Sequence, residues 1–436
     1  MRTKLNYRRT FFIGMAFLSI CAFWQMYDNM IPLMLQNSFG LGETATGTLM
    51  ALDNVLALIL LPVFGSFSDK VETGLGKRTP FILCGTVLAI IFMMLLPAAD
   101  RNGNLPLFMG ALFGALLAMG LYRSPAVALM PDLTPSHLRS RANAVINLMG
   151  AIGGVYALIM IRFLVGEGER PDYFPLFISI AALMALAVGI LLVTVRENRL
   201  RAALLAEKGE GGKDKEGIEV HLDHGGEAPK EALPSAVKHS MIFMLVSVFL
   251  WFTAYNAVTT AFSRYTRVVW GMEGGSFADC LMVATVAAIL SYIPIGNLSA
   301  RLGRKKTIMG GVLLMAACYA SAVFAVRYHP LINVAFALIG VAWAAINVNS
   351  YPMVVEMGKG GHIGKFTGTY YTFSMTAQII TPVLSGFLLE NVSYGTLFPY
   401  AFVFSLMAFV TMTQVRHGDV RPERKKSVLE NFDVED

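Results

Sequence analysis

The sequence predicts an all-α membrane protein in which twelve transmembrane helices form two similar six-helix bundles, with both termini in the cytoplasm. Of the 436 residues, 55% are hydrophobic and only 15% are charged, and the mean hydropathy is +0.58. A soluble domain carries roughly 25% charged residues, so this chain has too little polar surface for one. Uncharged stretches long enough to cross a bilayer as helices recur along the whole chain. The charged loop GSFSDKVETGLGKRTPFI at residues 65–82 returns in weaker form as GNLSARLGRKKT at 296–307, which indicates a duplicated half.

The apolar pattern breaks once in the middle of the chain. Residues 196–238 contain the charged, Gly-rich run EKGEGGKDKE, which is typical of a flexible linker, and the polar tail from residue 416 is expected to be disordered. The chain therefore divides into an N-terminal bundle (1–195), a cytoplasmic linker (196–238), a C-terminal bundle (239–415) and a cytoplasmic tail (416–436). The predicted spans are 11–36, 46–67, 80–97, 106–130, 141–164, 173–195, 239–264, 277–300, 307–326, 331–355, 366–389 and 397–415.

Charge distribution sets the orientation of these spans. The 35 Lys and Arg residues fall mainly in the loops on the same side as the termini, and the positive-inside rule places that side in the cytoplasm. The net charge of +6 thus reflects topology, and no nucleic-acid partner is expected because no soluble basic face exists.

All four cysteines lie in apolar spans, and their spacing matches neither a metal site nor a redox site. Short loops without extracellular disulfides suit a monomer in a bacterial inner membrane, the plasma membrane of such a cell.

Polar residues recur with a period of three helices. The third, sixth, ninth and twelfth spans contain neither charged residues nor Asn in their apolar stretches, whereas the first, fourth, seventh and tenth are the most polar. Because an ionisable group in lipid is costly, such groups face a bundle interior or a wet cavity. We therefore expect every third helix to face lipid and the polar set to line a central space.

The loop at 65–82 carries the most specific motif. Its GSFSDK…GKR pattern resembles the signature loop between helices 2 and 3 of the major facilitator superfamily, with extra residues inserted before GKR. More narrowly, SDKVETGLGKRTPFI, YRSPAVALMPDLTP at 122–135 and the following RSRANAV resemble the sucrose-porter and glycoside–cation symporter group. The resemblance covers nearly the whole chain. It implies the two-bundle fold of that superfamily and an alternating-access mechanism.

The resemblance also implies a cytoplasmic gate. In the family, Asp69 pairs across the bundle interface and holds the cytoplasmic side shut, and Asp132 and Glu356 occupy matching places in the two halves. Positive-inside charge alone would also explain the basic members, so a plain solvated turn is the alternative. The expected gate residues are Gly65, Asp69, Lys70, Lys77, Arg78, Asp132, Arg139, Arg301, Arg304 and Glu356.

Three charged residues fall inside the spans of the first half. Asp28 and Asp53 lie at one predicted depth on adjacent helices, where two carboxylates create a site that can take up a proton. Arg123 lies deep in the fourth span and needs an acid or a ligand, with Asp28 or Asp53 as its expected partner. The alternatives are that an Asp reaches the outer headgroups or caps a neighbouring helix, and that Asp53 with Asn54 only joins two helices by hydrogen bonds.

Aromatic and amide residues form helical stripes in both halves. A sugar site combines an aromatic face for the C–H side of a ring with amides and carboxylates for the hydroxyl groups. The alternative is ordinary packing of helices through Ser, Thr and Asn. The expected substrate-binding residues are Trp24, Gln25, Asn54, Asn147, Trp251, Tyr255, Asn256, Trp343, Asn347, Tyr351, Tyr371 and Gln378.

Together these features predict a proton-coupled sugar or glycoside symporter, with a bilayer and a small-molecule substrate as its partners. The melibiose-permease branch has paired sodium-binding aspartates where this chain has Ala57 and Leu61, so sodium is not expected. The sucrose-porter arginine falls at Val127, which leaves the particular sugar open. No enzyme motif, cofactor or metal site is evident. The alternatives are an exporter of drug-like or other small organic solutes and, less compatible with the short loops, a non-transporting receptor.

Overall fold

The computed structural model describes residues 5–135, 138–168, 170–202, 234–357 and 363–419 of the chain. Within them, twelve helices are long and apolar enough to cross a membrane, as predicted. Most of the predicted tail and most of the predicted linker lie outside the described residues. The chain is a multi-pass membrane protein.

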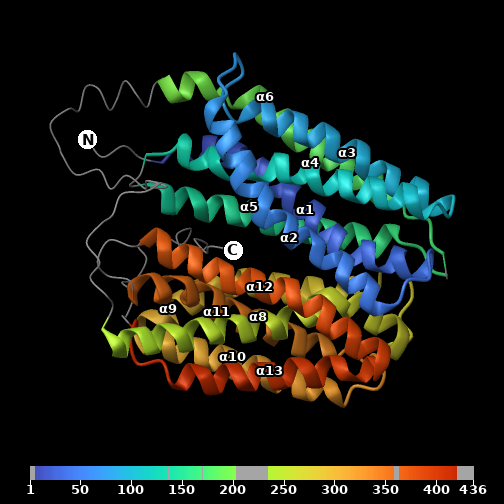
Figure 1. Cartoon of the computed structure of the whole chain (residues 1–436), viewed down its shortest axis with the longest axis vertical. Coiled ribbons are helices and arrows are strands. Elements are labelled where there is room, and N and C mark those ends of the chain that lie inside the picture. Colours follow the sequence, from blue (N-terminus) through green and yellow to red (C-terminus); the bar gives the residue numbers. More distant parts are fainter. Residues whose placement is uncertain (1–4, 136–137, 169, 203–233, 358–362, 420–436) are drawn as a thin grey trace.

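The N-terminal half contains α1 to α6, and the C-terminal half contains α8 to α13 (Figure 1). The first six are α1 (Tyr7–Asn37), α2 (Glu43–Lys70), α3 (Thr79–Arg101), α4 (Leu105–Asp132), α5 (Arg139–Leu164) and α6 (Phe174–Thr194). The second six are α8 (Ser235–Trp270), α9 (Ala278–Leu302), α10 (Arg304–Val323), α11 (Ile332–Met357), α12 (Ile363–Asn391) and α13 (Leu397–Thr413).

Most helices extend beyond the predicted spans because hydropathy detects only their apolar middle parts. The difference is largest at α8, which was predicted as 239–264 and whose polar first and last turns are also helical. Helix α8 ends at Gly271, whose left-handed backbone (φ 64°) is the usual glycine stop signal. At the start of α1, Asn6 caps the helix by accepting a hydrogen bond from the Arg9 backbone N–H at 3.0 Å.

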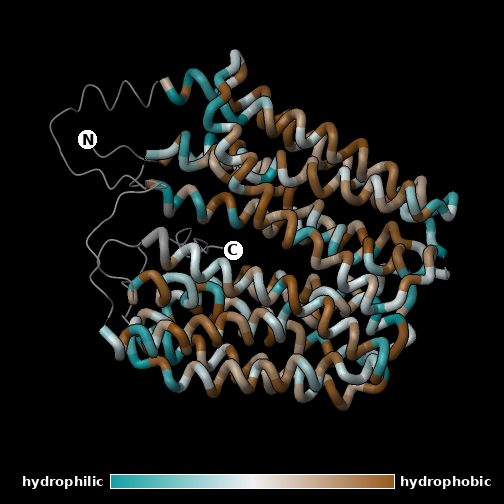
Figure 2. The backbone as a smooth tube through the Cα atoms, in the orientation of Figure 1, coloured by the Kyte–Doolittle hydropathy of each residue, from teal (hydrophilic) through white to brown (hydrophobic). Residues whose placement is uncertain are grey.

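The helices are arranged as two layers that meet along a seam. Helices α3 and α6 form one outer flank and α10 and α13 the opposite one, while α2 contacts α12, α5 contacts α9 and α1 contacts α8 across the seam (Figure 1). Hydrophobic residues follow the spans and hydrophilic residues gather at the helix ends (Figure 2). The flanking helices expose apolar side chains such as Leu186 (62%) and Val410 (60%), which a bilayer would cover. The expected lipid-facing role of every third helix agrees with this arrangement.

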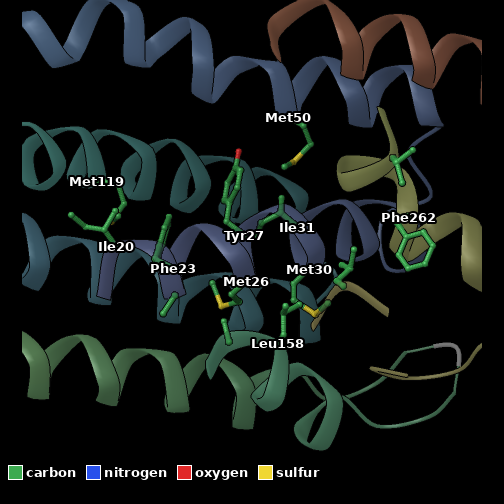
Figure 3. Packing of buried hydrophobic residues seen from close by; sticks show 14 of the residues in the cluster. Ile20, Phe23, Met26, Tyr27, Met30, Ile31, Met50, Met119, Leu158 and Phe262 are labelled. Carbon is green, nitrogen blue, oxygen red and sulfur yellow. The ribbon is translucent and has the colours of Figure 1, made fainter. Parts of the chain in front are cut away.

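Helix α1 lies at the centre of its half. Its buried side chains Phe23, Met26 and Met30 belong to the main hydrophobic cluster, together with Leu158 of α5 (Figure 3). This packing holds the polar positions of α1 in a fixed relation to α2, α4 and α5.

We call the end that the charge distribution places in the cytoplasm the inner end, and the opposite one the outer end. The loops after α2, α4, α9 and α11 lie at the inner end. The loops after α1, α5, α8 and α12 lie at the outer end.

Candidate functional site

The three charged residues predicted within the first half come together on α1, α2 and α4. Asp28, Asp53 and Arg123 are each half-buried. Asp28 interacts electrostatically with both Asp53 and Arg123, and Asp53 interacts with Arg123. Two acids and one base thus share a small region midway along the helices.

Their direct contacts differ from the predicted ion pair. Among the described residues, neither carboxylate lies within 4 Å of the Arg123 guanidinium, which instead lies over the Trp24 ring at 6.0 Å from its centroid. Asp53 accepts hydrogen bonds from the Asn54 backbone N–H at 2.6 Å and from Asn54 Nδ2 at 2.7 Å. Asp28 has no hydrogen bond or ion pair within the described part of the chain. The cation–π contact holds Arg123 near the acids without neutralising either one.

A cavity of about 20 Å³ lies beside these groups. Trp24, Asp53 and Arg123 form its polar lining, and the other lining side chains are apolar apart from Gly120. A volume of this size accommodates about one water molecule. One water in this cavity would lie beside the Asp53 carboxylate inside the bundle.

Tyr27 is a neighbour that the sequence interpretation missed. Its side chain is 1% exposed, and its hydroxyl has no hydrogen-bond partner within the described part of the chain. The charges of Asp53 and Asp28 both act on it. In Figure 3 the hydroxyl points away from α1 toward α2. The only sequence signal was its position directly before Asp28, which a search for charged residues does not use.

In the C-terminal half, two predicted aromatic residues meet face to face. The rings of Tyr255 on α8 and Trp343 on α11 stack with centroids 3.8 Å apart and planes 5° apart, and Phe252 meets Trp343 edge-on. Toward the inner end, Tyr351 packs against Tyr371 at 6.2 Å. The structure therefore groups four of the predicted aromatic residues into two pairs.

The remaining predicted substrate-binding residues have mixed settings. Trp251, one turn before Tyr255 on α8, is fully buried in the main hydrophobic cluster, and its Nε1 group has no hydrogen-bond partner among the described residues. Asn347 is 5% exposed, and Asn256 is half-buried with an Nδ2 group that lacks a partner among the described residues. Gln25, Asn147 and Gln378 are half-buried on α1, α5 and α12.

The predicted inner gate forms two matching ion-pair clusters, one in each half. Arg78 at the start of α3 binds Asp132 at the end of α4, with Nε–Oδ2 2.8 Å, and also ion-pairs with Asp69. In the other half, Arg304 at the start of α10 ion-pairs with Glu356 near the end of α11. Two further predicted members take part in contacts of the same loop: the Gly65 carbonyl accepts a hydrogen bond from Arg78 Nη1, and Lys77 forms an ion pair with Glu72. Arg139 is half-buried, and Lys70 and Arg301 are exposed.

Asp69 departs from the expectation that it pairs across the bundle interface. Its partner Arg78 belongs to the same loop and the same half. The physical reason is proximity: the loop between α2 and α3 folds back on itself, with Thr73 and Gly76 joined by two backbone hydrogen bonds. In this conformation the acid therefore stabilises its own loop.

Two carboxylates outside the predicted gate hold the third helix of each half. Glu197, 2% exposed, follows α6 and accepts hydrogen bonds from the backbone N–H groups of Lys77, Arg78 and Thr79 at 2.7 to 3.1 Å. Asp419, after α13, accepts one from Lys305 at 3.0 Å. A carboxylate at a helix N-terminus satisfies unpaired donors and complements the helix dipole. The prediction missed both, since it assigned them to a linker and a tail.

Glycines create the space for these two carboxylates. Gly76 (φ 129°) and Gly303 (φ 93°) both have positive φ, and a Cβ on either would lie within 3 Å of the capping carboxylate. Gly76 and Gly303 occupy corresponding positions in the two repeated loops. The internal duplication therefore includes the carboxylate caps on α3 and α10.

At the outer end, side chains from the two halves bind each other. Arg264 of α8 donates from Nε to Glu43 Oε2 of α2 at 2.8 Å, and both residues are less than 5% exposed. The Tyr394 hydroxyl also bonds Glu43. On the other side of the seam, Arg162 of α5 pairs with Asp279 of α9 at 3.0 Å. These contacts close the outer end, and the sequence interpretation had assigned no role to any of them.

Close backbone contact accompanies the ion pairs. A Cβ on Gly47 of α2 would lie 2.0 Å from the Pro382 carbonyl oxygen of α12. A Cβ on Gly275, before α9, would lie 2.0 Å from the Ile161 carbonyl oxygen of α5. The two halves therefore touch through their main chains, which only residues without side chains allow.

Two six-helix halves, a repeated charged loop and a charged site within the bundle are features of a transporter. The sequence profile described as Major Facilitator Superfamily matches residues 13–290 and 270–432. The chain belongs to this superfamily. It is accordingly a transporter and not an enzyme.

Individual relatives are distant. The chain is 23% identical over 226 residues to the sucrose transport protein SUT3 of Oryza sativa subsp. indica, which covers 43% of each chain. It is 26% identical over 182 residues to the sucrose transport protein SUC3 of Arabidopsis thaliana, covering 37% of this chain and 30% of that protein. The chain thus matches less than half the length of these relatives.

Solved structures extend the likeness to nearly the whole chain. The crystal structure of the nucleoside transporter NupG superposes with a TM-score of 0.67 at 15% identity, covering 94% of this chain and all of that one. This transporter therefore has the superfamily's fold. Its cargo has to be inferred from its own residues.

Proposed function

We propose that this transporter is a proton-coupled symporter of a sugar or glycoside that works by alternating access. The observation that carries the proposal is the group of Asp28, Asp53 and Arg123 on three helices of one half, beside a cavity with room for one water. Ionisable groups inside a membrane protein are costly and mark ion or substrate pathways.

The chemistry of this group fits a proton carrier. Asp28 and Asp53 repel each other when both are charged, and a proton on either one removes that repulsion. Arg123 lies over the Trp24 ring and forms no ion pair with a described residue. Its guanidinium can therefore move toward whichever of the two carboxylates is charged. The Tyr27 hydroxyl lies within electrostatic reach of both acids. Proton uptake therefore changes the charge balance on α1, α2 and α4 together.

The proposed cargo site is on the opposite side of the seam. Helix α8, which carries Tyr255, is a neighbour of α1, which carries Asp28. The Tyr255–Trp343 pair offers aromatic surface for the C–H side of a sugar ring, and Asn256 has an amide donor without a partner among the described residues. Two distant relatives are named sucrose transport proteins, which supports a sugar as cargo.

Proton and sugar transport are coupled if binding of both ligands changes the balance between the conformation closed at the outer end and the one closed at the inner end. The outer end is closed in this conformation by the buried Glu43–Arg264 pair and the exposed Arg162–Asp279 pair between the halves. Cargo and proton shift the populations of the two states only as far as their affinities for those states differ. We further propose that the protein acts as a monomer in a bacterial inner membrane, with the gate at 65–82 in the cytoplasm.

Uptake into proteoliposomes tests the proposal. The purified protein should accumulate labelled disaccharides when a pH gradient is imposed and only equilibrate them without one. Asp53→Asn should abolish accumulation while sparing sugar exchange, and Asp172→Asn, in an exposed outer loop, should leave both unchanged. Accumulation by Asp53→Asn at the wild-type level would remove Asp53 from coupling. Transport of hydrophobic amines without any sugar uptake would favour the exporter of drug-like solutes instead.

A further inference from the structure

A second small cavity lies at the outer end, where the two halves meet. Its volume is about 10 Å³, which is room for about one water-sized species. Asn37 at the end of α1 and Tyr173 before α6 line it from the N-terminal half. Ser263 and Arg267 of α8 line it from the C-terminal half. None of the sequence motifs involves these residues.

Three polar groups in this lining have no hydrogen-bond partner among the described residues. They are Asn37 Nδ2, Tyr173 Oη and Ser263 Oγ, and the side chains of Tyr173 and Ser263 are each 2% exposed. Asn37 and Tyr173 approach each other without forming a hydrogen bond of normal geometry. Buried polar groups are almost always paired with protein or with an ordered small species. Three unpaired groups at one cavity therefore indicate an occupant that the three side chains bind together.

The donor character of the site indicates the charge of that occupant. Amide and hydroxyl groups can all donate, and burial raises the pKa of Tyr173 to about 12, so its hydroxyl keeps its proton. Arg267, which also donates to the Gly168 carbonyl at 3.4 Å, contributes a cationic side chain to the lining, and none of the described lining residues is a carboxylate. Asp100 also acts electrostatically on Tyr173, but it lies outside the lining. The arrangement suits an acceptor with negative charge.

We propose that this cavity binds a single halide-sized inorganic anion, with chloride as the physiological ligand. A cavity with room for about one water-sized species suits a monatomic ion better than sulfate, phosphate or a carboxylate. Because Asn37 and Tyr173 belong to one half and Ser263 to the other, the anion joins the two halves at the closed outer end. It binds only while that end is closed, so chloride stabilises this conformation over one open to the outside. The inference does not depend on the identity of the transported cargo.

Thermal unfolding of the purified full-length protein tests the site in solution. At constant ionic strength, replacing gluconate by chloride should raise Tm saturably, by about 2 °C at ten times Kd. Ser263→Ala and Tyr173→Phe should each reduce this shift by more than half. Ser276→Ala, in the loop that precedes α9, removes an outer hydroxyl that is already bonded to the Glu273 carbonyl and should leave the shift unchanged.

Bromide provides a direct readout on the unmodified protein. Crystals grown in bromide should show anomalous density in the cavity between Tyr173 and Ser263. An ordered water there, with no bromide and no difference between chloride and gluconate, would overturn the proposal. A chloride shift of equal size in wild type and both cavity variants would also overturn it, because the anion would then bind elsewhere.

Discussion

Replacing Glu43 by Gln removes one charge from the ion pair that closes the outer end. Glu43 and Arg264 are 3% and 4% exposed, and the carboxylate also accepts from Tyr394. In Glu43→Gln the Arg264 guanidinium stays buried without its counter-charge as long as the outer end remains closed. Opening exposes both groups to water, so the substitution penalises only the closed state.

The size of this penalty follows from the burial of the pair. Removing one partner of a buried, hydrogen-bonded charge pair costs about 3 kcal/mol. This corresponds to a roughly hundredfold shift of the conformational equilibrium toward the outward-open state. Removing both charges with Glu43→Gln and Arg264→Gln leaves no unpaired charge, so the double variant should lie much closer to wild type.

Cysteine labelling measures this shift. Leu33 is 6% exposed and lines the outer cavity at the seam, so Leu33→Cys reports outer opening in a variant that lacks the four native cysteines. A membrane-impermeant maleimide added from outside should label it roughly a hundredfold faster with Glu43→Gln. Glu273→Gln, an exposed side chain in the outer loop before α9, is the control and should leave the rate unchanged. Equal rates for wild type and Glu43→Gln would refute the closing role of the pair.

Three further substitutions test other parts of the structure. Glu197→Gln weakens the cap on α3 and should destabilise the protein by about 2 kcal/mol, seen as a lower Tm, whereas Glu72→Gln on the exposed loop should not. Gly47→Ala should stop the outer end from closing and reduce uptake at least tenfold in proteoliposomes, while Gly110→Ala, which faces open space, should not. Tyr27→Phe should leave Tm unchanged, because its hydroxyl has no described partner, and should slow gradient-driven uptake. A fall in Tm without loss of uptake would reassign Tyr27 to packing.

The sequence was sufficient for the fold because hydropathy and the repeated loop are local signals. Twelve spans, two halves and lipid-facing third helices all follow from them. Arg78, Asp132, Arg304 and Glu356 were predicted as gate residues, whereas their pairing came from the structure, in which each pair joins the start of one helix to the end of the next.

The contacts between the halves were beyond sequence reasoning. Glu43 and Arg264 lie 221 residues apart, and each looked like an ordinary charge near a helix end. Trp251 and Tyr255 matched one stripe by their spacing, yet the structure buries Trp251 fully and Tyr255 only in part. Helical periodicity fixes which residues share a face, but the direction of that face is set by tertiary packing.

The caps formed by Glu197 and Asp419 have a practical consequence for protein engineering. Each half is completed by a residue that lies beyond its sixth membrane helix. A split protein whose two halves are co-expressed should therefore be divided after residue 202, so that the first fragment keeps Glu197. Likewise, a fluorescent protein fused directly after α13 would remove Asp419 from α10, whereas one attached beyond residue 419 would retain it.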